Sequence, residues 1–275
     1  MKSRIVFYCL LGGLPITFAA LGAGHFGWWW LSGIVLTAAF VPVALYGPRT
    51  ALRQFGAIAP VLAIITALCT WSEALVFVPA FRQRAARDLA GSLVMYLIVA
   101  AVLAALAWGL NLTKVPDCTV EHRSPVSAIA LVAVCGVAYV LYYLIFGAIT
   151  FQFFTKAYYP EATQIAMSLG RWFWVIQFGR GVLMTVAVMP VIYTLRMTRW
   201  QVALAAGALI WVAGGLAPLL VPNAFMGTTQ RMIHIVEILT QNASLGITAA
   251  LLLRPKATVR AASSAEGPAL LRHAS

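Results

Sequence analysis

The stretch from Arg171 to Thr194, RWFWVIQFGRGVLMTVAVMPVIYT, is apolar along most of its length but contains Arg180. Only fifteen residues, 181–195, separate Arg180 from the next charged residue, Arg196. They make about 22 Å of helix, whereas the hydrocarbon core of a bilayer is about 30 Å thick. A spanning helix must therefore draw Arg180 into the apolar layer, where it needs a carboxylate, backbone carbonyls or water. The sequence predicts a membrane helix whose neighbours supply a polar site.

The composition places the whole chain in the membrane. Of 275 residues, 9% are charged and 62% are hydrophobic, whereas soluble domains carry about 25% charged residues. We therefore expect an all-α, polytopic integral membrane protein with no room for a soluble domain. The net charge of +12 does not indicate nucleic-acid binding, because the basic residues lie at the ends of apolar segments, as topology signals do.

The apolar runs predict about eight transmembrane helices in one bundle over 1–255. The spans are expected near 4–23, 28–46, 56–80, 89–110, 126–150, 172–194, 200–220 and 231–253. The first run resembles a secretory signal, but it is long enough to span and is interpreted as a retained helix. The remaining segment, 256–275, is predicted to be a disordered basic cytoplasmic tail.

The distribution of basic residues predicts the orientation. With both termini inside, twelve Lys and Arg residues lie on the cytoplasmic side and six on the outer side. The turn containing Arg82, Arg84 and Arg87 runs against this rule, because it falls outside. We expect an integral protein of a bacterial inner (plasma) membrane with both termini cytoplasmic.

Neither a metal nor another cofactor is predicted. Cys9, Cys69 and Cys135 lie in apolar segments and Cys118 in a polar loop, without the spacing of a zinc site or a disulfide framework. His234 and Glu237 would supply only two ligands, fewer than a metal site in a helical bundle needs. The HExxH and Walker A motifs are also absent.

One face of the last predicted helix is polar. The spacings of three, three, four and three residues align the following side chains on it: Arg231, His234, Glu237, Gln241 and Ser244. Counted from the outer helix ends, Glu237 lies about 9 Å deep, Arg180 about 12 Å and Glu73 about 10 Å. We therefore expect one polar layer in the outer leaflet, with Arg180 paired to Glu237 or to Glu73.

The ligand-binding candidates are the polar side chains of this layer. They are Arg180, Glu237, His234, Gln177, Gln241, Glu73, Tyr142 and Tyr143. The pattern favours a small transporter or a solute- or lipid-binding permease, in which Arg180 holds an anionic small molecule or a lipid headgroup.

Two alternatives stay open. The first is an intramembrane enzyme acting on a lipid or lipid-linked substrate, with His234 as acid or base. The second is a non-catalytic subunit of a membrane complex, in which the polar groups only fix helix packing. The sequence assigns neither catalytic residues nor an oligomeric state.

Overall fold

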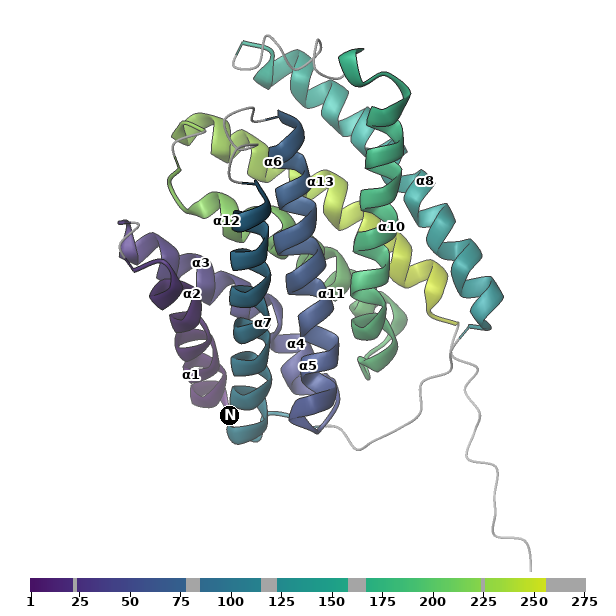
Figure 1. The fold of residues 1–275 in the computed structure, drawn as a ribbon. Coiled ribbons are helices and arrows are strands. Elements are labelled where there is room, and N and C mark those ends of the chain that lie inside the picture. The colour runs from purple at the N-terminus through teal and green to yellow at the C-terminus, as the bar shows by residue number, and fades with distance from the viewer. Residues whose placement is uncertain (22–23, 78–84, 115–122, 158–166, 224–225, 256–275) are drawn as a thin grey trace, which may run out of the picture.

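The computed structural model describes residues 1–21, 24–77, 85–114, 123–157, 167–223 and 226–255. Over these ranges the chain forms helices joined by short turns, and it contains no β-strand, only an isolated bridge between Asn223 and Met226. The predicted all-α membrane bundle is confirmed (Figure 1). The predicted tail, 256–275, lies outside the described residues, as do Arg82, Arg84 and Cys118.

Seven helical rods are long and apolar enough to cross a membrane among the described residues. They are Phe26–Tyr46, Ala51–Val76, Ala86–Gly109, Pro125–Thr155, Arg171–Thr194, Arg199–Leu220 and Thr228–Leu253. Each overlaps one of the predicted spans after the first. The apolar run lengths thus located these seven rods, because lipid demands both continuous helix and continuous apolar surface.

The N-terminal segment differs from the single helix predicted near 4–23. It consists of α1 (Lys2–Gly12) and α2 (Leu14–Ala19), which meet at Gly13. Pro15 lies in the first turn of α2, where its missing N–H costs no hydrogen bond. Both pieces pack against α3 and α7, and a Cβ on Gly13 would lie 2.9 Å from the backbone nitrogen of Ile34. They therefore form an eighth, broken rod at the edge of the bundle.

The rods follow one another in alternating directions (Figure 1). In chain order they are α1–α2; α3 (Phe26–Ala39) with α4 (Val41–Tyr46); α5 (Ala51–Pro60), η1 (Val61–Cys69) and α6 (Thr70–Phe77); α7 (Ala85–Gly109); α8 (Pro125–Thr150) with η3 (Phe151–Thr155); α10 (Arg171–Thr194); α11 (Arg199–Trp211), η4 (Val212–Leu216) and α12 (Ala217–Leu220); and α13 (Thr228–Leu253). Met1, the α4–α5 turn and the last turn of α13 lie at one end, hereafter the N-terminal end.

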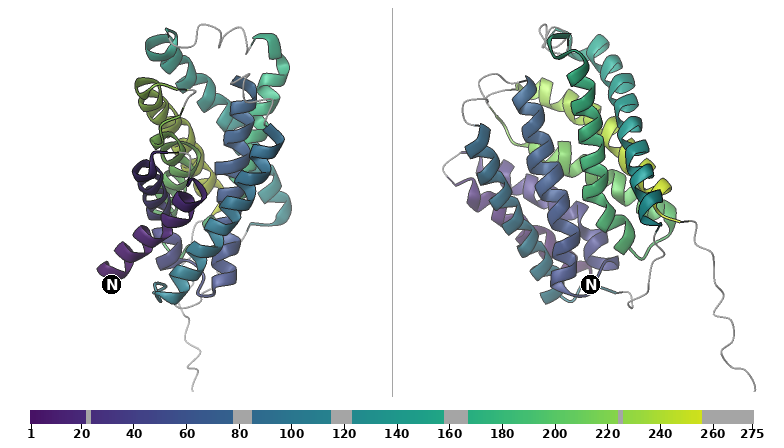
Figure 2. Two further views of the ribbon diagram at one scale, coloured as in Figure 1. Left: turned by 60° about the vertical axis from the view of Figure 1, so that its left-hand side comes forward. Right: turned by 45° about the vertical axis from the view of Figure 1, so that its right-hand side comes forward.

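The rods differ in how much surface they leave to the surroundings. In an apolar 18-residue stretch of the rod Arg199–Leu220, 56% of the residues are buried, and the share is 50% in the corresponding stretches of Ala51–Val76 and Arg171–Thr194. In Ala86–Gly109 and Pro125–Thr155 that share is only 22%. The first three therefore form the centre, while α7 and α8 present broad apolar faces to lipid. Figure 2 shows α8 beside α10 at one edge, and these two helices pack against each other and against α13.

Small residues let the central helices approach closely. A Cβ on Gly246 of α13 would lie 2.6 Å from the carbonyl oxygen of Ala206 and 2.6 Å from Gly207 Cα. Gly136 of α8 and Gly181 of α10 form a similar crossing, since a Cβ on Gly181 would lie 3.1 Å from Gly136 Cα. Such contacts are how helices associate in lipid, where water does not drive them together.

Two rods contain wider π-helical turns at the centre. The segment η1 follows Pro60, whose ring cannot donate the hydrogen bond of a regular helix. It packs against η4, and the buried Asn242 donates to the carbonyl oxygen of Ile210, at 3.4 Å, in the helix that precedes η4. Backbone carbonyls displaced from the regular pattern are costly in lipid, so Asn242 stabilises this irregularity.

Arginine side chains close several helix C-termini. Arg254 donates to three carbonyl oxygens after α10 or in its last turns, at 2.8–3.3 Å, and Arg231 donates to Leu219 and Leu220 at the end of α12. Arg4 caps α7 at Leu110, and Arg123 and Arg199 cap the end of α13 at Leu252 and Leu251. Terminal carbonyls lack partners in their own helix and carry partial negative charge. Part of the positive charge is therefore structural.

Candidate functional site

Arg180 is paired with Glu73 of α6 rather than with Glu237. Arg180 Nη2 donates to Glu73 Oε2 at 2.8 Å, and Nη1 donates to Gln177 Oε1 at 3.0 Å. Gln177 precedes Arg180 by three residues on α10, so both side chains emerge from the same helical face. Of the two partners expected from the sequence, the structure therefore selects Glu73.

The local backbone determines which side of α6 carries Glu73. The carboxylate follows the nine π-helical residues of η1 by four positions. Each π turn holds more residues than an α turn, so η1 changes the face on which later side chains emerge. A regular helix from Ala51 would not place Glu73 on the same side.

Helix α8 covers the other side of the guanidinium. Arg180 Cζ lies 5.9 Å from the centroid of the Tyr139 ring, within the range of a cation–π contact. The contact depends on Gly181, since a Cβ there would lie 2.6 Å from Tyr139 Cβ. Gly179, on the other side of Arg180 in sequence, has no atom within 4 Å of its ideal Cβ position.

A second polar group lies on α13. His234 Nδ1 is 2.9 Å from Glu237 Oε2, and Gln241 Nε2 donates to Glu237 Oε1 at 3.2 Å. The three- and four-residue spacings predicted this shared face. Helix α8 passes beside it at Gly147, where an ideal Cβ would lie 3.7 Å from Glu237 Oε1 and 3.6 Å from Gln241 Nε2.

The two groups belong to one polar layer, defined here as Glu73, Gln177, Arg180, His234, Glu237 and Gln241. Arg180 and Glu237 each lie nine residues after the first residue of their helices, which is about 14 Å of helix. Tyr139 and Tyr143 lie within electrostatic reach of Arg180 and of both carboxylates. The two groups therefore share the same two tyrosines as neighbours, and their action as one binding layer stays a prediction.

The two candidate tyrosines have different surroundings. The Tyr143 ring lies 5.7 Å from that of Phe173, edge to face, and 6.3 Å from that of Tyr139, so it borders the layer. The Tyr142 hydroxyl instead lies 2.8 Å from Thr248 Oγ1. Thr248 follows Glu237 by eleven residues on α13, about 16 Å along the axis. Tyr142 therefore contacts a different level of the bundle.

The layer is enclosed but not sealed. The side chains of Arg180 and Glu237 are 9% and 13% exposed, whereas those of Glu73 and His234 are 32% and 23% exposed. Arg180 Nε is buried and has no hydrogen-bond partner among the described residues. An unpaired donor at membrane depth is costly, so this nitrogen is a position where a ligand or water would be stabilised.

The layer offers oxygen and nitrogen ligands but no described metal centre. Over the described ranges, no group of three or more His, Cys, Asp or Glu side chains is placed to hold a metal ion. Its chemistry is that of a permanent cation beside one carboxylate and an imidazole beside another. Such a set can bind an anion and can exchange a proton.

One contributor was missed from the sequence. Tyr139 is fully buried against Arg180, but among the many aromatic residues of the chain it looked like part of an interface belt. The available signal was its four-residue spacing to Tyr143, which places both rings on the face of α8 toward α10. No protein-family model matches this chain, and no curated protein and no solved structure matches it.

Proposed function

We propose that this multi-pass membrane protein is a small permease that carries an anionic solute in exchange for, or together with, a proton. The observation that carries the proposal is the pairing within the polar layer. A permanent cation, Arg180, is matched to Glu73, and a titratable imidazole, His234, is matched to Glu237. Intramembrane ionisable residues of this kind commonly mark solute and proton pathways.

The anion would bind at Arg180 in competition with Glu73. Glu73 is the most exposed member of the two pairs, so its carboxylate can move away while Gln177 and Tyr139 still hold the guanidinium. An incoming carboxylate or phosphate would then take the place of Glu73 and reach the unpaired Arg180 Nε. The fork of guanidinium donors matches such planar or tetrahedral anions.

The proton would be held by the second pair. One proton can lie on His234 or on Glu237, at a separation of 2.9 Å between nitrogen and oxygen. Its arrival or loss changes the charge of the layer by one, while Arg180 stays charged. A change of that size in an enclosed layer shifts the affinity for an anion, which is the coupling a proton-linked permease requires.

Reconstitution into liposomes loaded with a pH-sensitive dye tests the proposal. Inorganic phosphate, a phosphate monoester and several small carboxylates would each be added outside, and the lumenal pH followed. We expect one class of anion to drive proton movement. Arg180→Gln should slow it at least about thirtyfold, as for other truncations of buried, hydrogen-bonded charge pairs.

Two further variants make this experiment specific. Glu237→Gln should keep binding of the anion but lose coupled proton movement. Arg171→Gln removes an exposed arginine at the start of the same helix and should leave transport unchanged. If no tested anion gives a flux that depends on Arg180, the permease proposal is wrong. If Arg180→Gln lowers only the folded yield, the layer acts in packing alone.

The second candidate, an intramembrane enzyme, is favoured by one contact. Glu237 lies against Nδ1 of His234, and a carboxylate in that position commonly orients an imidazole that acts as a general base through its other nitrogen. This reading predicts that vesicle lipids are modified by the purified protein and that His234→Gln abolishes the product. Unchanged vesicle lipids by mass spectrometry would argue against it.

A further inference from the structure

A row of polar side chains continues along α13 from the polar layer toward the N-terminal end of the bundle, where the last turn of α13 lies (Figure 1). Gln241, Ser244 and Thr248 follow Glu237 at spacings of four, three and four residues. These spacings place the four side chains on one helical face, over about 16 Å of helix. Together with Tyr142 of α8, they are called the polar seam below.

Helix α8 covers both ends of this row. At one end, an ideal Cβ on Gly147 of α8 would lie 3.6 Å from Gln241 Nε2. At the other end, the Tyr142 hydroxyl lies 2.8 Å from Thr248 Oγ1. Ser244 lies on the same face of α13 between these two contacts. The polar seam therefore follows the contact between α8 and α13.

The polar seam is reached by small molecules without facing lipid broadly. From Glu237 to Leu253 no residue of α13 is exposed, whereas Val236, directly before this stretch, is 60% exposed. Glu237, Ser244 and Thr248 are half-buried. Because this stretch has no broadly exposed side, the accessible parts of these three side chains lie along the contacts with neighbouring helices. Carboxylate and hydroxyl groups in such positions offer water the several polar partners that stabilise it.

Helix packing alone gives a weak reason for the polar seam. Hydrogen bonds between polar side chains of membrane helices contribute little to stability, because the separated helices find other partners. Thr185 and Thr37 show a local arrangement, in which each hydroxyl donates to the carbonyl oxygen four residues earlier, at 2.8 and 2.7 Å. Thr248 Oγ1 instead meets the hydroxyl of another helix, and either oxygen can be the donor. A hydrogen bond that can reverse its direction is what proton transfer along hydroxyls requires.

We infer that the polar seam conducts a proton between Glu237 and the N-terminal end of the bundle. The inference rests on the permease function proposed above and names the side chains of its proton path. Without such a path, a proton on Glu237 would face about 24 Å of α13, because Leu253 follows sixteen residues later. The seam shortens this to about 8 Å, the distance along the helix from Thr248 to Leu253.

The spacing of the polar seam suits transfer through single water molecules. Ser244 and Thr248 are four residues apart, about 6 Å along the helix. One water that makes two hydrogen bonds of about 2.8 Å bridges such a gap. Each hydroxyl accepts one proton on its oxygen and releases the proton that it carried, so no side chain of the path is changed after transfer. Gln241, which donates to Glu237 Oε1 at 3.2 Å, orients the carboxylate at the start of the path.

Proton movement in liposomes, measured per folded protein, tests the polar seam. The full-length protein would be reconstituted with a pH-sensitive dye inside, and inorganic phosphate, glycerol phosphate or acetate would be added outside. Thr248→Val keeps the shape of the side chain but removes its hydroxyl. It should slow the pH change about tenfold, as the loss of one hydrogen bond along the path would. Tyr142→Phe should have the same effect, and Thr248→Ser, which restores the hydroxyl on a smaller side chain, should recover most of the rate.

A second measurement separates proton movement from anion binding. The rise in unfolding temperature that each anion causes in detergent should be equal in wild type and Thr248→Val, because the polar seam does not hold the anion. The matched control is Thr185→Val, which removes a buried hydroxyl from α10 with the same change of shape and should leave the pH change unaffected.

Three outcomes would contradict the inference. Wild-type rates in both Thr248→Val and Tyr142→Phe would overturn the polar seam and leave the permease proposal intact. A loss in Thr248→Val that Thr248→Ser does not recover would assign the contact to helix packing and overturn the seam as well. If none of the three anions moves protons through the wild-type protein, the permease proposal and the polar seam both fail.

Discussion

At the scale of single residues, the energetics of the bundle centre on Arg180. Its side chain cannot lose its proton, so it must be matched wherever the helix places it. Glu73, Gln177 and the Tyr139 ring do so from three helices. A buried pair of this kind need not stabilise the fold relative to apolar residues, but breaking it is costly.

A double-mutant cycle tests whether Arg180 is paired with Glu73 rather than with Glu237. Arg180→Leu and Glu73→Leu should each destabilise the protein by about 3–5 kcal/mol, because each leaves an uncompensated charge. The double variant should cost clearly less than the sum. Unfolding in mixed micelles, followed by tryptophan fluorescence, gives the three free energies.

Glu237→Leu provides the comparison, since Glu237 is matched by His234 and Gln241. Its coupling to Arg180→Leu should be the smaller of the two. A larger coupling with Glu237 than with Glu73 would contradict the pairing described here.

The sequence predicts a depth for these charges and two possible partners for Arg180, but it does not choose between the two. Depth follows from the length of uncharged helix beside Arg180, which can be counted. The choice between Glu73 and Glu237 depends on rotation about helix axes, and η1 changes that rotation just before Glu73. The sequence also did not predict that Arg231 caps the end of α12, since its contacts to Leu219 and Leu220 depend on how two rods meet.

At the scale of helices, apolar length predicted the seven rods, while local geometry did not follow from it. Nothing in the run from residue 51 to 76 except Pro60 marks a π segment, and nothing distinguishes a break at Gly13 from a kink at Pro15. Such features depend on which neighbours can repair the backbone, as Asn242 does for Ile210.

The crossing of α11 and α13 gives a prediction at this scale. Gly246→Ala should destabilise the bundle by about 1–3 kcal/mol, because the new methyl group meets backbone rather than a mobile side chain. Gly56→Ala is the matched control: it lies in α5 with no atom within 4 Å of an ideal Cβ. It should be neutral or stabilising, by up to about 1 kcal/mol. Thermal unfolding of the two variants measures both changes in stability. Similar losses of stability in the two variants would mean that α11 and α13 cross less closely than described.

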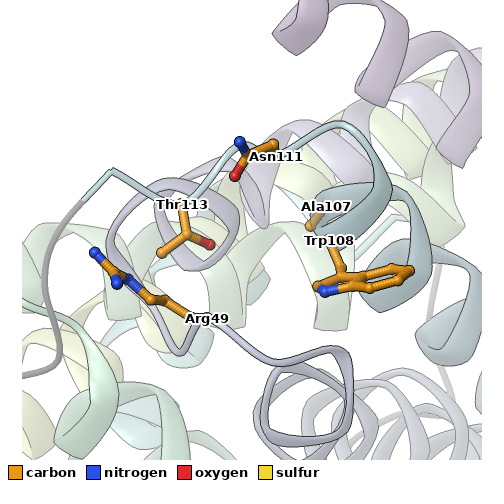
Figure 3. A pocket seen from close by; sticks show the side chains of 5 residues that line it. All are labelled: Arg49, Ala107, Trp108, Asn111 and Thr113. Carbon is orange, nitrogen blue, oxygen red and sulfur yellow. The ribbon is translucent and has the colours of Figure 1, made fainter.

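At the scale of the whole molecule, the polar layer and the N-terminal end of the bundle differ in their side chains. The polar layer lies toward one end between α6, α8, α10 and α13. A pocket lined by Arg49, Trp108 and Asn111 lies at the N-terminal end, between the α4–α5 turn and the end of α7 (Figure 3). Arginines close helix ends on both sides, so substitution of Arg254 or Arg231 would disturb packing rather than only topology. Several basic residues of this chain therefore stabilise helix ends, in addition to any effect of their charge on the orientation in the membrane.

The last prediction concerns the number of crossings. Seven rods have the length and apolarity of spans, and α1–α2 forms a broken eighth beside α3 and α7. If α1–α2 crosses the membrane, the start of α1 and the α4–α5 turn lie on one side and the start of α13 on the other, as the alternating directions in Figure 1 indicate. Ser3, Thr50 and Thr229 belong to these three segments. Single cysteines at these three positions, in a Cys118→Ser background, would be probed in intact cells with a membrane-impermeant maleimide.

We expect rapid labelling at Thr229→Cys alone, with Ser3→Cys and Thr50→Cys labelled only after the membrane is opened. The physical reason is the density of basic residues that would otherwise have to cross, including Arg49 and Arg53 beside Thr50. Labelling of Ser3→Cys together with Thr229→Cys, with Thr50→Cys protected, would show that α1–α2 does not span and that the bundle has seven crossings. Labelling of Thr50→Cys with Thr229→Cys protected would invert the whole orientation.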